Sequence, residues 1–153
     1  MSEYTIRDAT EQDVLEVVIA VKQFCKEIPH PAWKSFEANK VSELLTNLIR
    51  HELGLVKIVE YEGEIVGALI GVISSLPINN LTFAQELMFW IEPEHRNGKT
   101  GPKLIDQYVV WSKENGCEFV RLSTLDEILG SRAGVLYRRK GFKPTETAYI
   151  KEI

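Results

Sequence analysis

The period of the hydrophobic pattern changes near residue 54, and this change limits the folds that the chain can adopt. Upstream, over 14–24 and 41–53, apolar residues recur every three or four positions, which is typical of amphipathic helices. Downstream, over 55–91, apolar runs separated by turn residues are typical of strands. A chain that carries both periods is expected to form a mixed α/β fold, in which helices pack on a sheet.

Turn and cap residues divide the chain further. The expected elements are strands at 4–7, 55–61, 64–74, 81–91, 119–123 and 148–150 and helices at 14–24, 41–53, 101–115 and 133–137. Gly54 is expected to cap the second helix, and Glu62-Gly63 to form a hairpin turn. The segment 86–116 predicts the one parallel crossover in the sheet. A length of 153 residues predicts a single domain over 1–153.

Composition narrows the class of protein. A hydrophobic content of 44% and a charged content of 26% are typical of a soluble globular protein. No apolar run approaches the ~20 residues that span a bilayer, so we expect a cytoplasmic protein without a membrane partner. The net charge of −4 argues against nucleic-acid binding. The two cysteines and three histidines lack the spacing of a metal site, so no metal is expected.

The segment 95–101, His-Arg-Asn-Gly-Lys-Thr-Gly, lies between an expected strand and an expected helix. A helix N-terminus presents unpaired N–H groups and a partial positive charge, which together hold a phosphate group. Glycines allow a close approach of the backbone, and basic side chains add charge. A glycine-rich connector without a ligand would have the same pattern. The glycine motifs of Rossmann folds and of P-loops are both absent.

This turn resembles the acyl-coenzyme A pyrophosphate loop of the GNAT superfamily, whose pattern is Arg or Gln, two residues, Gly, one residue, then Gly or Ala. Arg96 and Gly101 match the first and last positions. Lys99 stands at the position of the central glycine, and Gly98 comes one residue early. This departure raises the alternative that Lys99 blocks the cradle.

Two other segments support the resemblance, in the order in which the family has them. The opening 6–13, Ile-Arg-Asp-Ala-Thr-Glu-Gln-Asp, resembles the first strand and turn, and 134–142 resembles the last helix, where a tyrosine precedes Gly-Phe. The resemblance implies the GNAT N-acyltransferase fold, a mainly antiparallel sheet with one parallel crossover and helices on both faces. It also implies acetyl-CoA as co-substrate and a primary amine of a small molecule or peptide as acceptor.

The resemblance also assigns residues to the cofactor. The residues expected to bind acetyl-CoA are Trp90, Ile91, Arg96, Asn97, Gly98, Lys99, Thr100, Gly101 and Ser131. Trp90 would act through its backbone N–H, which points at the thioester carbonyl where the strand separates from its neighbour, while its ring is expected to pack. Ser131 lies where many relatives have an asparagine that touches the pantetheine, although a role as N-cap is the simpler interpretation.

Glu86, in the middle of the 81–91 strand, is the candidate general base. Its spacing before Arg96 resembles that of a catalytic glutamate in the histone-acetyltransferase branch of the superfamily. Strict alternation would place Glu86 on one face with Met88 and Trp90, where an apolar setting raises its pKa. The alternatives are a base supplied by a water chain, or a merely structural charge on a half-exposed strand.

Tyr137 resembles the general acid of the family, whose hydroxyl approaches the sulfur of the coenzyme. A tyrosine pKa of about 10 suits it to protonate a leaving thiolate. A buried aromatic residue with a bonded hydroxyl is the alternative. Trp33 and Phe36 lie in the connection between the first two helices, which usually covers the acceptor site in this superfamily. They are expected either to line that site or to close the core.

Three hypotheses about function remain open on the sequence. The first is an acetyl-CoA-dependent N-acetyltransferase. The second is a non-catalytic acyl-CoA-binding sensor or regulatory module, which would have no need of both Glu86 and Tyr137. The third is an interaction protein that has lost the ligand, which Arg96 and Lys99 argue against. The identity of the amine stays open, and a homodimer is compatible with the superfamily, whose members often form dimers.

Overall fold

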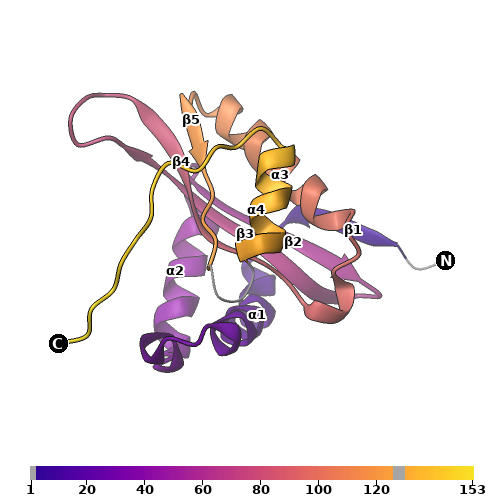
Figure 1. The fold of residues 1–153 in the computed structure, drawn as a ribbon. Coiled ribbons are helices and arrows are strands. Elements are labelled where there is room, and N and C mark those ends of the chain that lie inside the picture. Colours follow the sequence, from indigo (N-terminus) through magenta and orange to yellow (C-terminus); the bar gives the residue numbers. More distant parts are fainter. Residues whose placement is uncertain (1–2, 126–129) are drawn as a thin grey trace. The chain divides into compact units, whose positions relative to one another are not determined.

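The structure is a computed structural model that describes residues 3–125 and 130–153 (Figure 1). The chain forms two compact units, Met1–Ser123 and Thr124–Ile153. The elements of the first unit are β1 (Tyr4–Asp8), α1 (Val14–Glu27), α2 (Ala38–Arg50), β2 (Gly54–Tyr61), β3 (Glu64–Ser75), β4 (Thr82–Ile91), α3 (Thr100–Glu114) and β5 (Phe119–Arg121), with 3-10 turns at Glu11–Asp13, Pro31–Lys34 and Pro93–His95. The second unit contains α4 (Gly130–Arg139). A single domain over 1–153 stays a prediction.

The strands of the first unit form one sheet in the order β1-β2-β3-β4-β5. The first three pairings are antiparallel, and β4 and β5 are parallel. Two consecutive parallel strands need a crossover connection, and α3 provides it (Figure 1). The expected mixed α/β fold and the parallel crossover within 86–116 are therefore confirmed.

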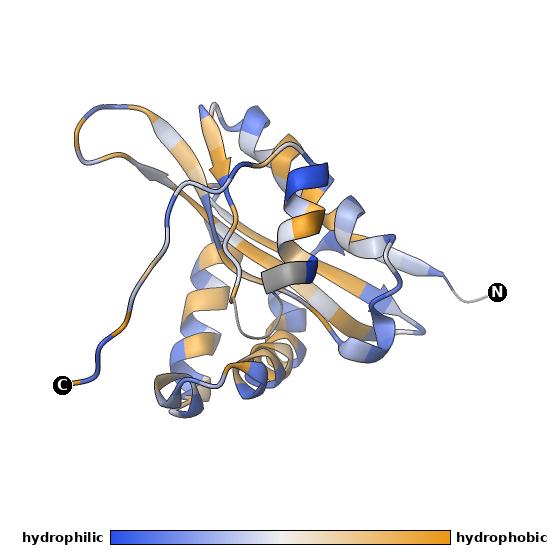
Figure 2. Ribbon diagram, in the orientation of Figure 1, coloured by the Kyte–Doolittle hydropathy of each residue, from blue (hydrophilic) through white to orange (hydrophobic). Residues whose placement is uncertain are grey.

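Each face of this sheet has its own apolar core. On one face the side chains of α1 and α2, among them the fully buried Leu45, pack on the strands. On the other face α3 packs on the sheet through Leu104. Successive side chains of β3 point to opposite faces, so Ala68 and Ile70 enter the first core and Leu69 the second. Figure 2 shows the hydrophobic residues concentrated along the central strands and on parts of the helices.

The hairpin between β2 and β3 forms as the sequence predicts. Glu62 has φ of 51° and Gly63 has φ of 80°, the pair of left-handed conformations that a two-residue type I′ turn requires. At the start of the chain, the Asp13 carboxylate accepts from the Thr10 N–H at 2.7 Å, which closes the capping box before α1. These local signals set where the first helix and the central hairpin begin.

Gly54 is not a helix cap, contrary to the prediction. The helix α2 ends at Arg50, and Gly54 is the first residue of β2, without a left-handed φ. A Cβ atom at Gly54 would lie 2.5 Å from the Leu48 carbonyl oxygen and 2.7 Å from its Cα. A glycine is therefore required here because β2 passes very close to the backbone of the preceding helix.

The predicted last strand at 148–150 is also wrong. The chain after Gly141 has no helix or strand, and the Tyr149 and Ile150 side chains are 92% and 63% exposed. Apolar residues in an extended segment form a strand only when a neighbouring strand supplies hydrogen-bond partners. The pattern of the segment is compatible with a strand, but the structure provides no ladder for it in the described residues.

The close approach at Gly54 gives a prediction for stability. Substitution Gly54→Ala forces a Cβ atom against backbone atoms of Leu48 and is expected to lower the free energy of unfolding by about 1–3 kcal/mol. The measurement is chemical denaturation followed by circular dichroism. Gly134→Ala is the control, because its Cβ would meet only the flexible end of Arg138 at 3.4 Å. Equal stability of Gly54→Ala and the parent protein would contradict the packing described.

Candidate active site

Strand β4 carries the predicted base, and its register against β3 contains an irregularity. Gly71 pairs with Glu86, whereas the preceding residue of β3, Ile70, pairs with Met88, so β4 has one extra residue in a β-bulge. Adjacent residues of β3 point to opposite faces, and their partners Glu86 and Met88 therefore do so too. The prediction that Glu86 shares a face with Met88 and Trp90 is wrong, because simple alternation does not include a bulge.

Strand β4 loses one of its two neighbours halfway along its length. The ladder with β5 contains only Phe83–Gln85 and Phe119–Arg121. Beyond it, Glu86 and residues 88–91 pair with β3 alone among the described strands. Alternate backbone N–H groups of an extended strand point to opposite sides, so this part of β4 presents donors toward an open edge. The resemblance implies such an opening for the Trp90 N–H.

The Glu86 side chain lies at the start of this opening and is almost fully buried. The residue is 8% exposed, and its Oε1 accepts from the Ser123 N–H at 3.1 Å and from the Ser123 hydroxyl at 2.9 Å. Burial raises the pKa of the Glu86 carboxyl, and the two bonds from Ser123 partly lower it. A carboxylate with a raised pKa is suited to accept a proton near neutral pH.

The sequence reasoning did not find Ser123. The residue lies two positions after the end of β5, and only the parallel pairing of β5 with β4 brings it beside Glu86. The register of β4 against β5 was the signal that could have indicated this contact. With Phe83 opposite Phe119, the ends of both strands advance together toward Glu86 and Ser123.

The turn at 95–101 is held in shape by one of its own side chains. The Asn97 Oδ1 atom accepts from the N–H groups of Lys99 at 2.8 Å and Thr100 at 3.0 Å, and its Nδ2 donates to the Thr100 hydroxyl at 3.0 Å. Gly98 has φ of 77°, a conformation that favours glycine. Thr100 and Gly101 are buried at the start of α3, whereas Lys99 is exposed. The turn therefore leads directly into the N-terminus of α3, and a helix N-terminus favours the binding of an anion.

The Arg96 side chain binds protein groups on both sides of the turn. Its Nε donates to the Ile91 carbonyl at 2.7 Å, and its Nη2 donates to Glu27 Oε1 at 3.0 Å and Oε2 at 3.1 Å. The Trp90 indole N–H also donates to Glu27, and the Trp90 ring packs in the core, as predicted. Arg96 therefore joins the turn to the ends of β4 and α1. The sequence reasoning missed Glu27, because no local pattern marks a contact across 69 positions.

Tyr137 and Ser131 belong to the second unit. Tyr137 lies near the end of α4, and its ring centroid is 6.1 Å from that of Phe142. Gly141 follows the helix with φ of 89°, as expected of a residue that ends a helix. Ser131 is in the first turn of α4, and its side chain lies outside the described residues. The roles of Tyr137 as acid and of Ser131 as a cofactor contact stay predictions.

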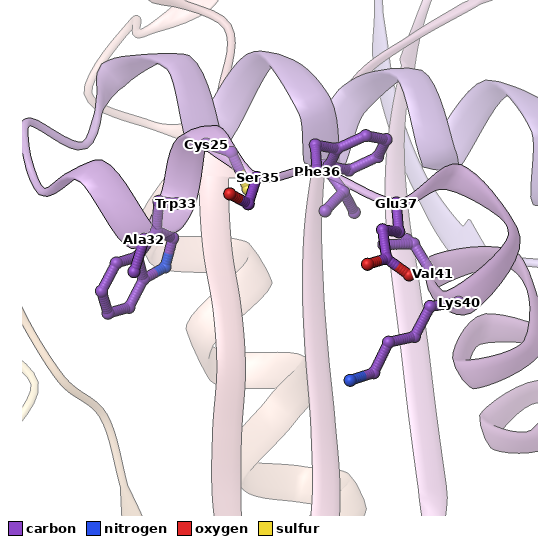
Figure 3. A pocket seen from close by; sticks show the side chains of 9 residues that line it. Cys25, Ala32, Trp33, Ser35, Phe36, Glu37, Lys40 and Val41 are labelled. Atoms are coloured by element: carbon purple, nitrogen blue, oxygen red, sulfur yellow. The ribbon is translucent and has the colours of Figure 1, made fainter.

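A cavity of about 390 Å³ lies between the end of α1 and the start of α2 (Figure 3). Its lining consists of Val21, Cys25, Ala32, Trp33, Ser35, Phe36, Glu37, Lys40 and Val41. Trp33 and Phe36 both contribute to this lining, and Phe36 also packs against the core on the α1–α2 face. Cys25 is a free cysteine whose thiol pKa is raised by burial. The cavity is thus a largely apolar space with charged groups from Glu37 and Lys40.

Two other kinds of site have no counterpart in the described part of the chain. Residues 3–125 and 130–153 contain no cluster of three or more His, Cys, Asp or Glu side chains arranged to hold a metal ion. None of the helices described there has the length and apolar character needed to cross a bilayer.

Several solved structures have the same fold. An aminoglycoside N-acetyltransferase in complex with CoA superposes with a TM-score of 0.78 and 16% identity, over 100% of this chain and 96% of that one. A ribosomal-protein-alanine N-acetyltransferase from Brucella melitensis has a TM-score of 0.74 and 15% identity, over 98% and 99%. For a glucosamine-6-phosphate N-acetyltransferase from Arabidopsis thaliana the values are 0.75 and 15%, over 98% of both chains. At these identities the likeness establishes the fold.

Sequence comparison then identifies the family. No curated protein matches the chain. The acetyltransferase (GNAT) domain family matches residues 52–144, which is more than half of the chain and includes β2 to α4 with the turn before α3. The matched segment contains Glu86 and two of the three segments on which the resemblance was based, the turn at 95–101 and the segment 134–142. The chain therefore belongs to the GNAT acetyltransferase family.

Proposed function

We propose that this chain is an N-acetyltransferase that transfers the acetyl group of acetyl-CoA to a primary amine of a small molecule or peptide. The observation that carries the proposal is the buried Glu86 carboxylate with its raised pKa, on the strand that leads into the turn before α3. An amine is protonated near neutral pH and must lose a proton before it can attack a thioester. A base on β4, upstream of an anion-binding helix N-terminus, meets this requirement.

The turn before α3 has features that fit the diphosphate of acetyl-CoA, which is the co-substrate in this proposal. The Asn97 side chain already bonds the N–H groups of Lys99 and Thr100, so the turn is shaped before a ligand arrives. Lys99 is exposed, which supports a role in attracting the diphosphate rather than in filling the cradle. The similar aminoglycoside N-acetyltransferase was solved in complex with CoA, which supports the same cofactor.

The chemistry assigns one task to each of three groups. The Glu86 carboxylate takes a proton from the ammonium group, directly or through a water molecule. The amine nitrogen bonds to the acetyl carbon, and the Trp90 N–H donates to the carbonyl oxygen as it gains negative charge. The carbon–sulfur bond then breaks, and the Tyr137 hydroxyl gives its proton to the leaving thiolate. The nitrogen loses its second proton, which replaces the proton that Tyr137 gave up. The products are the acetylated amine and CoA.

The cavity between α1 and α2 supports a location for the acceptor. Trp33 and Phe36 provide apolar surface for the body of an amine substrate, and the Glu37 carboxylate provides a partner for a second cationic group. The similar structures include acetyltransferases of an aminoglycoside and of glucosamine 6-phosphate, and they differ widely in acceptor. A cytoplasmic location and a homodimer also remain predictions.

One observation favours a second candidate, a non-catalytic module that binds an acyl-CoA. The Glu86 Oε1 atom is occupied by two donors from Ser123, an arrangement that would also suit a purely structural carboxylate. A binding module would retain acetyl-CoA affinity and have no turnover with any amine. Substitution of Glu86 separates the two candidates, because it lowers the rate of acetyl transfer only if the protein is an enzyme.

The proposal predicts that acetyl-CoA stabilises the protein and that Lys99 contributes to binding. At 100 times its Kd, acetyl-CoA is expected to add about 2.7 kcal/mol to the free energy of unfolding. Lys99→Glu places a negative charge beside the diphosphate and is expected to weaken binding about tenfold. Calorimetric titration measures both proteins. Lys113→Glu, with the same charge change at the other end of α3, is the control and should bind as the parent does. An absence of acetyl-CoA binding by the parent protein would reject the proposed function.

Substitution Glu86→Gln tests the base. In the parent protein the rate is expected to rise with pH through the raised pKa of Glu86, because the carboxylate accepts a proton only when it is ionised. The glutamine variant should lose this rise, and its turnover should fall by about 100-fold or more. Its affinity for acetyl-CoA should be retained. Release of free thiol from acetyl-CoA across a panel of amines and pH values measures the effect. An unchanged pH–rate profile would remove Glu86 from the mechanism.

Substitution Ser123→Ala tests the hydrogen bonds to Glu86. It removes the hydroxyl donor, which stabilises the ionised carboxylate, and leaves the Ser123 N–H in place. The pKa of Glu86 should therefore rise further, and the rising limb of the rate should move to higher pH. Ser42→Ala, on α2, serves as the matched control and should leave the profile unchanged. A shift to lower pH in Ser123→Ala would contradict the assigned contact.

A further inference from the structure

We propose that Glu27 is a positioning residue that couples the cofactor-binding turn to the cavity between α1 and α2. The inference rests on the proposed function, because it concerns the sites suggested for acetyl-CoA and for the amine. The structural observation is that one carboxylate, at the last residue of α1, binds the side chains of Arg96 and Trp90. These three residues are called the Glu27 clamp below.

The contacts of the clamp are directional and charged. Arg96 Nη2 donates to Glu27 Oε1 at 3.0 Å and to Oε2 at 3.1 Å, and the same guanidinium donates through Nε to the Ile91 carbonyl at 2.7 Å. The Trp90 indole N–H donates to the Glu27 carboxylate. The Arg96 and Glu27 side chains are only 21% and 25% exposed, so water competes weakly for these bonds. Charge-assisted bonds of this kind are stronger than neutral ones.

On the cofactor side, the clamp fixes the start of the turn. Arg96 is the residue at which the chain leaves the 3-10 turn Pro93–His95 and enters the segment shaped by Asn97. Its charge is neutralised by Glu27, so its side chain sets the position of the turn rather than adding a free cation to it. A diphosphate that shifts the turn would therefore pull on the Glu27 carboxylate.

On the cavity side, the clamp fixes the end of α1. Val21 and Cys25, on the last turns of this helix, line the cavity. Ile28, directly after Glu27, is 2% exposed and anchors the chain before it turns into the rest of the lining. A displacement of the Glu27 side chain is therefore expected to move both the end of α1, which lines the cavity, and the connection that follows it. The clamp therefore links these two regions through side-chain hydrogen bonds.

Two other sets of ion pairs among the described residues do not join these two regions. Arg7 bonds Asp13 and Glu60, which join the first strand to its surroundings. Arg50 pairs with Glu11 at 2.5 Å between side chains that are 67% and 51% exposed. Exposed pairs of this kind contribute little to stability. The pair of Arg50 and Glu11 thus offers a matched control, in which the same chemical change leaves both proposed sites untouched.

Hydrogen–deuterium exchange on the full chain, with CoA as the probe, tests the coupling. CoA should slow exchange at 97–105, where it binds, and also at 28–41, in the cavity connection, by about fivefold or more. In Glu27→Gln the slowing at 97–105 should persist and the slowing at 28–41 should be lost. The measured quantity is the change in exchange rate that CoA causes. A variant that is merely less stable would exchange faster both with and without CoA, so it would not reproduce this result.

The outcomes separate this inference from the proposed function. No slowing at 97–105 in the parent protein would reject the proposed CoA site. Slowing at 97–105 without any effect at 28–41, or an effect at 28–41 that survives in Glu27→Gln, would overturn the coupling alone. Glu11→Gln should behave as the parent protein does. If Glu27→Gln does not fold, Trp90→Phe removes only the indole bond of the clamp and should reduce the effect at 28–41, and an undiminished effect in it would also overturn the coupling.

Discussion

The divergence of β4 and β5 is the constraint on which the candidate site depends. The two strands pair over only three residues, and the extra residue Leu87 then alters the course of β4 relative to β3. An extended strand that loses a neighbour has backbone donors without sheet partners, and such donors need another group to bind. We propose this open edge as the place where acetyl-CoA binds. The bulge also turns Glu86 to the face opposite Met88, where Ser123 meets it.

The segments around the open edge of β4, which are the turn before α3 and the end of α1, are held by side-chain hydrogen bonds rather than by regular backbone ladders. Asn97 shapes the turn before α3 from within, and Arg96 ties it to β4 through the Ile91 carbonyl. Glu27 then joins the turn to α1, on the face of the sheet that carries the cavity. These polar contacts lie at the rim of two well-packed cores, so they adjust positions without carrying the main stability of the fold.

Elements with a strong local signal were predicted well from the sequence. The amphipathic period placed α1 and α3, and the Glu62-Gly63 pair placed the central hairpin, because backbone geometry and side-chain spacing there depend on neighbours in the chain. Gly54 was misinterpreted because a glycine after a helix is compatible both with a cap and with close packing. The tail at 148–150 was misinterpreted because a strand depends on a partner that the segment itself does not contain.

The sequence by itself determined the two hydrophobic periods, the order of the elements in the first unit, and the motif of the turn before α3. Each of these depends on interactions within a few residues, so it is visible in the chain as written. The tertiary structure alone decided the face on which Glu86 lies, its contact with Ser123, and the meeting of Glu27 with Arg96. These depend on strand register and on packing between distant segments, where one extra residue reverses the direction of a side chain.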